Sequence, residues 1–390
     1  MPGMGTGLDA NNPTIVSAFQ AFLLRQGLVV LVILSLLAVA WLVLRTAELR
    51  GANGTDKEYP NSLPVSPTFA EPFARRLLRI GFGILWIFDG ILQAQPKMPL
   101  GMTTGVIEPA ASASSHWVQQ VANAGATVWS YHPIDAPASA VWIQIGIGVL
   151  LIAAPRGWWS RVAGLASIFW GLVVWVFGEA FGGIFAPGLT WLFGAPGAVL
   201  LYAFAGALIA LPERWWSTPR LGRAVLGVMG AFFVGMAVLQ AWPGRGFWRG
   251  HIGHRATLAT LGTLAGMTHQ MSQTSQPNFL SSWIASFTSF DAAHGFAVNL
   301  FVVIALAALG FAFLGGRASI VRAAVVFGVV FCLADWVLIE DLGFLGGVGT
   351  DPNSMIPMSL VFVAGYFAIA KLPVTSDAVV PFASHARQQG

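Results

Sequence analysis

Long apolar segments, separated by short polar stretches, make up most of this chain. A transmembrane helix needs roughly 17–25 mainly apolar residues, and nine segments fall in that range. They cover residues 27–44, 77–95, 138–154, 160–179, 195–211, 222–242, 295–315, 321–340 and 355–371. The pattern therefore predicts an all-α, polytopic membrane protein with nine transmembrane helices.

The polar stretches between these segments suggest how the chain is divided. Two long ones, 96–137 and 243–294, contain amphipathic segments such as HWVQQVANAG, which we expect to lie along the membrane surface. The boundaries predict an outer tail with the first helix at 1–45, an inner linker at 46–74, four-helix units at 75–212 and 213–373, and a tail at 374–390.

Charged residues are scarce and unevenly placed. Only 9% of the residues are charged and 56% are hydrophobic, a composition typical of a multi-span membrane protein. The basic residues concentrate on alternate loops, so the positive-inside rule predicts a cell-membrane protein with its N-terminus outside and its C-terminus cytoplasmic. The net charge of +4 reflects this bias and does not indicate a nucleic-acid partner. The basic residues of these loops include Arg75, Arg76, Arg156, Arg161, Arg214, Arg220, Arg317 and Arg322.

The second part of the chain repeats the first. The stretch GILQAQP at 90–96 aligns with AVLQAWP at 237–243, and residues 158–212 align with 319–373. Each half then holds four predicted helices, an even number, so the halves have the same orientation and form a parallel repeat behind one extra N-terminal helix. The alignment pairs Gln93 with Gln240, Trp175 with Trp336, Glu179 with Glu340, and Pro196 with Pro357.

The stretch RRLLRIGFGILWIFDGILQAQPKMP at 75–99, a long outer loop and three closely spaced helices resemble the DoxX-like family. That family comprises small four-helix membrane proteins related to the membrane subunit of thiosulfate:quinone oxidoreductase. The resemblance covers each half once, so the chain looks like a fused pair of such units. It implies quinone-linked redox work beside protein partner subunits, which we expect at the outer face.

Four acids in or at the ends of predicted helices are the candidate proton or quinone site. Ionised acids in a bilayer are costly, by about 2.5–3.5 kcal/mol each on insertion scales, and are usually functional. Glu179 and Glu340 end their helices at equivalent positions, where they could also serve only to cap the span. Asp89 and Asp335 lie deeper and have no acidic counterpart in the other half.

Four further polar or aromatic residues are weaker candidates for holding a cofactor. Trp175 and Trp336 each precede a repeated glutamate by four residues. Gln93 and Gln240 lie one turn before a proline, where hydrogen bonding to freed backbone is the simpler role.

Histidine and methionine lie mainly in the outer loops. His251, His254, Met267, His269 and Met271 combine imidazole and thioether ligands, which suit copper. Their irregular spacing also suits an ordinary interfacial loop. No predicted span carries a buried histidine, so a transmembrane haem b, which needs axial ligands on helices, is not expected.

Three functions remain open at this level. The first is a membrane subunit of a quinone-linked redox complex, and the second is a transporter for a small solute or cation, including copper. The third is a structural or assembly subunit. The DoxX-like repeat and the acids favour the first, and the repeat together with intramembrane acids favours the second. Against the second, transporters usually have broken helices near the midplane, whereas these acids lie toward one face. We rank the three in the order given.

Overall fold

The computed structural model describes residues 10–52, 71–252 and 260–370, and within them the chain is helical, with a single isolated β-bridge between His251 and Leu261. The apolar segments form the helices, as predicted. The elements are α1 (Pro13–Ala52), α2 (Phe73–Gln93), α3 (Met98–Met102), a π-helical turn (Thr103–Ile107), α4 (Glu108–Ser112), α5 (His116–Tyr131), α6 (Asp135–Ala153), α7 (Gly157–Phe177), 3₁₀ turns at Ala180–Gly183 and Trp191–Phe193, α8 (Ala198–Ala210), α9 (Glu213–Trp216), α10 (Pro219–Ala241), α11 (Thr263–Ser272), α12 (Asn278–Gly315), α13 (Ala318–Leu338) and α14 (Met355–Ala370).

Six helices of the described residues are long and apolar enough to cross a membrane: α1, α6, α7, α10, α12 and α13. A seventh crossing results if α2 is counted with residues 98–112, toward which the chain bends by 99°. The other two predicted spans are α8 and α14, with only 13 and 16 residues. At 1.5 Å per residue they are about 20 and 24 Å long, shorter than a hydrocarbon core of about 30 Å.

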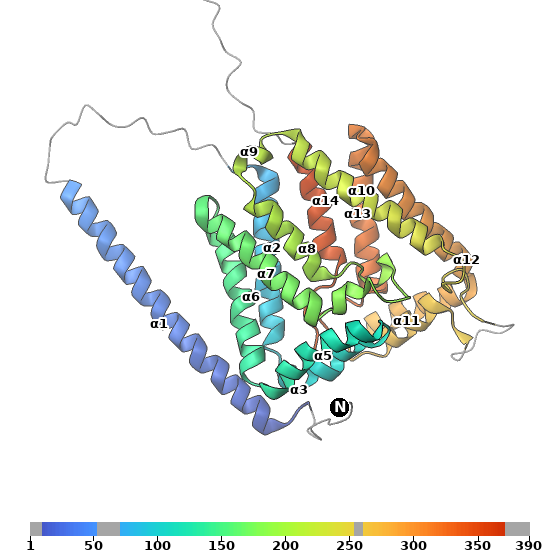
Figure 1. The fold of residues 1–390 in the computed structure, drawn as a ribbon, viewed down its shortest axis with the longest axis horizontal. Helices are drawn as coiled ribbons and strands as arrows, with labels where there is room; N and C mark the ends of the chain where they lie inside the picture. The colour runs from blue at the N-terminus through green and yellow to red at the C-terminus, as the bar shows by residue number, and fades with distance from the viewer. Residues whose placement is uncertain (1–9, 53–70, 253–259, 371–390) are drawn as a thin grey trace, which may run out of the picture.

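The long helices pack as a bundle in which α2 lies against α6, α10 against α12, and α7 against α8 (Figure 1). The short helix α14 lies between α2, α10 and α13. The connections α6–α7, α8–α10 and α12–α13 all lie at one end of the bundle. Helices α3, α5 and α11 cover the opposite end. The predicted basic side therefore corresponds to the first end, and the long loops to the second.

Two pairs of glycines allow the helices to approach closely. A Cβ on Gly148 of α6 would lie 2.5 Å from the carbonyl oxygen of Gly83 on α2, closer than any real side chain allows. A Cβ on Gly310 of α12 would lie 2.8 Å from the carbonyl oxygen of Gly230 on α10. The absence of a side chain therefore sets the separation of both helix pairs.

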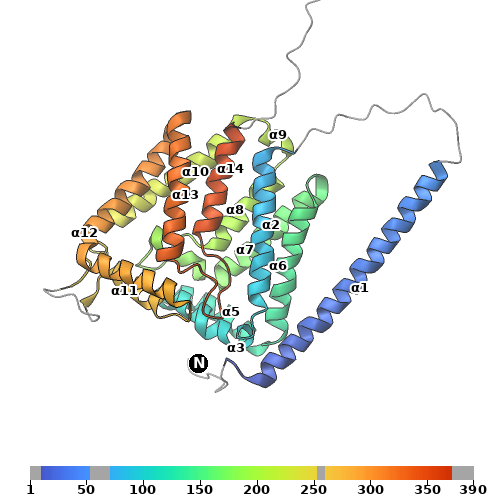
Figure 2. The ribbon, with the colours of Figure 1, turned by 180° about the vertical axis from the view of Figure 1, so that it is seen from behind.

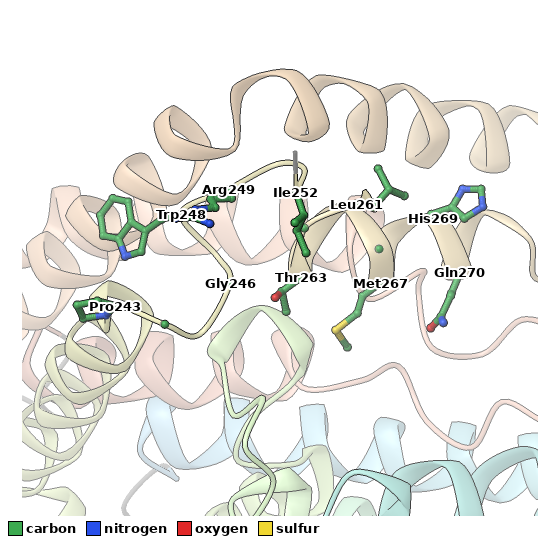
Figure 3. A pocket seen from close by; sticks show the side chains of 13 residues that line it. Pro243, Gly246, Trp248, Arg249, Ile252, Leu261, Thr263, Met267, His269 and Gln270 are labelled. Carbon is green, nitrogen blue, oxygen red and sulfur yellow. The ribbon is translucent and has the colours of Figure 1, made fainter. Parts of the chain in front are cut away.

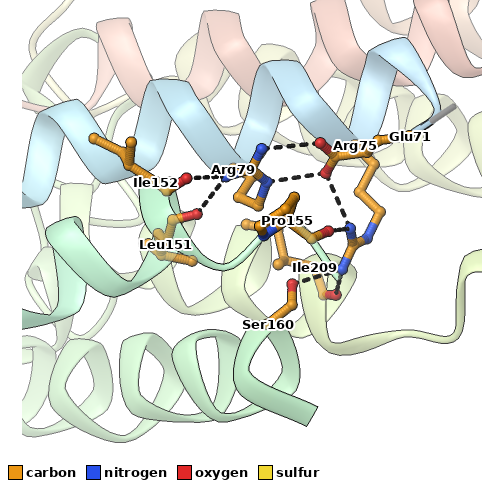
Figure 4. Close-up of polar contacts among 8 residues, drawn as sticks. All are labelled: Glu71, Arg75, Arg79, Leu151, Ile152, Pro155, Ser160 and Ile209. Carbon is orange, nitrogen blue, oxygen red and sulfur yellow. Dashed lines mark hydrogen bonds and ion pairs between the residues drawn. The ribbon is translucent and has the colours of Figure 1, made fainter. Parts of the chain in front are cut away.

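A buried ionic network fastens the basic end of α2 (Figure 4). Arg79 forms a bidentate pair with Glu71, with both N···O distances at 2.9 Å, and donates to the carbonyl oxygens of Leu151 and Ile152 at the end of α6. Arg75 pairs with the same glutamate at 3.0 Å. Arg75 also donates to Ser160 of α7 at 2.6 Å and to the carbonyl oxygen of Ile209 of α8 at 3.2 Å. The two arginines thus satisfy carbonyls at the ends of α6 and α8 and also bond to a side chain of α7.

Helix α1 stands apart from this bundle (Figure 2). Its contacts with the bundle are made by its first half. Trp142 of α6 donates to Gln26 Oε1 at 2.9 Å, and Phe19 is fully buried. Beyond this point its leucines and valines are exposed, Leu44 by 66%. An exposed apolar helix of this length is stable only in a lipid environment.

Candidate functional site

The repeated glutamates cap the two short helices. Oε1 of Glu179 accepts a hydrogen bond from the backbone N–H of Val199 in the first turn of α8, at 3.3 Å. Glu340 accepts from Ser354 and Met355 at the start of α14, at 3.2 and 3.3 Å. The first N–H groups of a helix have no partner inside it and favour a negative charge. Each glutamate therefore stabilises the short helix of its own half.

The repeated tryptophans hold the loops that lead into these helices. The indole N–H of Trp175 donates to the carbonyl oxygen of Pro196, and that of Trp336 to the carbonyl oxygen of Pro352, both at 2.8 Å. The equivalent prolines are thus Pro196 and Pro352, whereas the sequence offset pairs Pro196 with Pro357. That the indoles bind a cofactor stays a prediction. Their N–H groups already donate to these two carbonyl oxygens.

The chain turns in the same way after both glutamates. The backbone N–H of Glu179 bonds to the carbonyl oxygen of Val174 at 2.9 Å, and that of Glu340 to Asp335 at 3.0 Å. The next two residues then take left-handed conformations, Ala180 and Phe181 in one half and Asp341 and Leu342 in the other. Such conformations are uncommon for residues other than glycine and persist where their surroundings impose them.

Asp89 is the least satisfied acid of the site. It is 1% exposed, and no described residue donates a well-formed hydrogen bond to either of its carboxylate oxygens. The hydroxyl of Tyr202 on α8 lies beside it, also without a well-formed bond. The ring of Tyr202 is held edge-to-face by Trp86 and Phe82 of α2, with centroids 4.8 and 5.2 Å away. A buried polar group without a partner costs about 1–3 kcal/mol or more, so such a group in a native fold calls for an explanation.

The other acids extend the site across the bundle. The charge of Asp89 interacts with those of Glu179 and Asp351, and the charge of Glu340 interacts with those of Glu179, Asp335 and Asp351. Asp335 is 3% exposed, and neither of its carboxylate oxygens has a partner among the described residues. The structure therefore brings all four predicted acids into one group, which also includes Asp351 and Tyr202. We call this group the carboxylate cluster.

Three acids of the carboxylate cluster, Glu179, Glu340 and Asp351, lie in loops beyond the ends of the helices. Burial raises the pKa of Glu179, and the neighbouring Asp351 raises it further, although the N–H groups of α8 oppose the shift. Burial likewise raises the pKa of Glu340 and of Asp351. Removal from water disfavours the charged form, and acids of like charge add to the effect. These acids hold protons at a pH where exposed acids have lost them.

The two candidate glutamines differ in their surroundings. Gln240 accepts from Thr190, and its amide group donates to Asn299 of α12 at 2.7 Å. Gln93 lies at the equivalent end of α2, is 4% exposed, and its amide oxygen has no partner in the described part of the chain. Gln240 is thus a structural link, and Gln93 adds one more free acceptor near Asp89.

The predicted copper ligands lie apart from the acids. Met267 and His269 line a surface cavity beside α11, together with Trp248 and Arg249 (Figure 3). His251 contacts the carbonyl oxygen of Ala292 through Nδ1 at 2.8 Å, and His254 lies outside the described residues. The cavity lining does not include His251 or Met271. Across the described ranges, no three His, Cys, Asp or Glu side chains come close enough to hold a metal ion.

Sequence reasoning missed Asp351 and Tyr202. Asp351 lies in the stretch GGVGTDPNS, which reads as a flexible turn before the last helix. Its Oδ1 accepts from the N–H of Asn353 at 2.8 Å, an Asx turn that the sequence Asp-Pro-Asn could have indicated. Tyr202 lies in a uniformly apolar helix, and no local signal marks it.

Comparison of the chain with family models, with curated proteins and with solved structures gives no match.

Proposed function

We propose that this chain is a membrane carrier that takes up protons at the buried carboxylate cluster and moves them across the membrane. The observation that carries the proposal is Asp89: a buried acid beside the hydroxyl of Tyr202 and near Glu179 and Asp351, to whose oxygens no described residue donates a well-formed hydrogen bond. A carboxylate in this setting is stable when protonated and costly when charged. A group of this kind is suited to alternate between the two forms during a transport cycle.

The short helices support a carrier over a static subunit. Short or interrupted apolar segments at corresponding positions of two halves point to the binding site in many transporter folds. Here α8 and α14 are the two short segments, and the glutamates at their first turns belong to the carboxylate cluster. This feature favours the transporter hypothesis over the two alternatives.

The parallel repeat is part of the same proposal and has structural support. The glycine pair Gly83–Gly148 in one half matches Gly230–Gly310 in the other. The tryptophan–proline bonds, the helix caps and the left-handed turns after the glutamates also occur once in each half. We propose nine membrane segments, of which α8 and α14 are the two shortest.

The spacing of the acids favours protons over a metal ion. Several carboxylates are near enough to influence one another's charge, yet in the described ranges no three of them could share one metal ion. Protons need no common coordination sphere, and acids that repel one another share protons readily. The bound species that we propose is therefore the proton.

We further propose that the basic end of the bundle faces the cytoplasm and that α3, α5 and α11 lie at the outer surface of the cell membrane. The distribution of Arg156, Arg214 and Arg317 supports this orientation. The two alternative functions, a redox subunit and an assembly subunit, stay predictions. So do partner subunits at the outer face, and a quinone or copper as a ligand.

Proton flux into liposomes tests the proposal. Purified protein is placed in liposomes that hold a pH-sensitive dye, and a potassium diffusion potential drives protons inward. We expect flux well above that of empty liposomes, abolished in Asp89→Asn and retained in Glu108→Gln, an exposed acid of α4. Flux equal to that of empty liposomes, or unchanged flux in Asp89→Asn, would overturn the proposal.

A further inference from the structure

Each half of the protein sends its loop to the other half. The loop of the first half, 178–197, reaches the end of α10, where Thr190 bonds to Gln240 and Arg245 donates to the carbonyl oxygen of Pro187 at 3.0 Å. The loop of the second half, 339–354, reaches the end of α2, where Gln95 donates to the carbonyl oxygen of Gly349 at 3.2 Å.

Further contacts fix the second loop against α2 and α3. The rings of Phe88 and Phe344 meet edge-to-face, with centroids 5.5 Å apart. A Cβ on Gly101 would stand 2.8 Å from the side chain of Val348. The two loops also meet each other, because Ser354 donates to the carbonyl oxygen of Gly194 at 2.5 Å. The second loop is thus held between α2, α3 and the first loop.

This crossing delivers Asp351 to the acids of both halves. Asp351 is 7% exposed, and its carboxylate accepts from Asn353 N–H and from Thr350 Oγ1, both at 2.8 Å. Its charge interacts with Asp89 and Glu179 of the first half and with Glu340 of the second. Glu179 of the first half likewise interacts with Asp89 of its own half and with Asp351 and Glu340 of the second.

The first half has no equivalent acid. The tryptophan–proline bonds match Pro196 with Pro352, and the preceding residues are then Ala195 and Asp351. Ala195 is buried and apolar. The arrangement is therefore asymmetric: the residue before the bonded proline is a carboxylate in the second half and an alanine in the first.

We infer that Asp351, placed by the crossed loop beside Glu179, joins the acids of both halves into one proton-sharing unit, so that neither half forms a complete site alone. The inference deepens the proposed function and rests on it. Protonation of Asp89 then changes the proton affinity of Glu340 through Asp351 and Glu179 together. The other titratable side chains facing this unit are Tyr202 of α8 and Asp335 and Cys332 of α13, and Lys97 lies against the same loop at Gly347.

Infrared difference spectroscopy over a pH titration tests the inference. The signals of Asp89 and Glu340 are assigned from Asp89→Asn and Glu340→Gln. Compared with the wild type, we expect Asp89→Asn to shift the titration of Glu340, and Glu340→Gln to shift that of Asp89. In Asp351→Asn, which keeps an oxygen for the N–H of Asn353, we expect this mutual shift to become smaller, because only the link through Glu179 is left. Asp341→Asn is the matched control, because Asp341 lies in the same loop but bonds to Thr274 at 2.6 Å, and none of the cluster acids acts on its charge.

Two results would overturn the inference. One is a mutual shift of Asp89 and Glu340 that persists unchanged in Asp351→Asn. The other is an equal loss of that shift in Asp341→Asn, which would indicate a general effect on the loop. If no acid of the wild type titrates at all, the proposed function itself fails. Size-exclusion chromatography of each variant confirms that it is folded before the titration.

Discussion

Glu179 Oε1 lies 3.3 Å from the backbone nitrogen of Val199 and accepts its hydrogen bond. The bond spans twenty residues and joins the end of a long helix to the start of a short one. The same relationship recurs between Glu340 and Met355. It explains why the pattern Trp-x-x-x-Glu occurs twice: the tryptophan holds the loop, and the glutamate caps the helix that follows.

Loss of either indole bond should destabilise the protein. We expect Trp175→Phe and Trp336→Phe each to lower the free energy of unfolding by about 1–2 kcal/mol, because a partly buried carbonyl loses its donor. Thermal unfolding in detergent, followed by intrinsic fluorescence, measures the effect. Trp158→Phe is the control, since Trp158 is 68% exposed. An equal change in all three variants would contradict the assigned role.

The close helix contact at Gly148 should not tolerate a methyl group. Gly148→Ala forces α2 and α6 apart, which we expect to cost about 1–3 kcal/mol. Gly146→Ala, two residues away on the same helix, has open space around the new Cβ, and alanine is there the better helix former. The two variants should therefore shift the melting temperature in opposite directions. Equal shifts would mean that α2 and α6 do not pack as described.

The ion pair between Arg79 and Glu71 should matter more than its position at a helix end suggests. Both side chains are almost fully buried, so removing one partner leaves an uncompensated charge. We expect Glu71→Gln to destabilise the protein by about 3–5 kcal/mol. Arg76→Gln, an exposed neighbour on α2, should change the free energy of unfolding by less than about 0.5 kcal/mol. An unchanged free energy of unfolding in Glu71→Gln would show that the pair is not buried in the folded protein.

Stability should fall as the pH rises. The pKa of Glu340 is raised by burial in the folded state, so the folded protein binds this proton more tightly than the unfolded chain does. The stabilisation is complete below the ordinary glutamate pKa of about 4.3 and is lost as the pH rises through the folded value. We expect the melting temperature in detergent to decrease over this window, less steeply in Glu340→Gln. A melting temperature that rises with pH would contradict the assignment.

Hydrophobic length predicted the positions of the helices but not all of their roles. The residue pattern places a helix at each of the nine segments, because apolar length and helix length go together. The length of α8 depends on its capping by Glu179, which stands at the start of the preceding loop, and this is a tertiary contact. The bend after α2 likewise follows from packing, although Pro96 marks its place.

The acids of the site were predictable as individual residues and not as a cluster. Asp89 and Asp335 stand out in the sequence because a charge in an apolar helix is rare. Asp351 does not stand out, because an aspartate before proline is ordinary in a loop. Its importance arises from the crossing of the two loops, which brings together residues 262 positions apart (89 and 351) and leaves no local pattern.

The most direct test of the account is an infrared pH-difference spectrum of the purified protein in lipid, recorded for the wild type, Asp89→Asn and Glu108→Gln. The account predicts a carboxylic-acid signal in the wild type that disappears on alkalinisation, is missing in Asp89→Asn and is unchanged in Glu108→Gln. A spectrum of Asp89→Asn identical to that of the wild type would show that Asp89 exchanges no proton, and the central claim would be wrong.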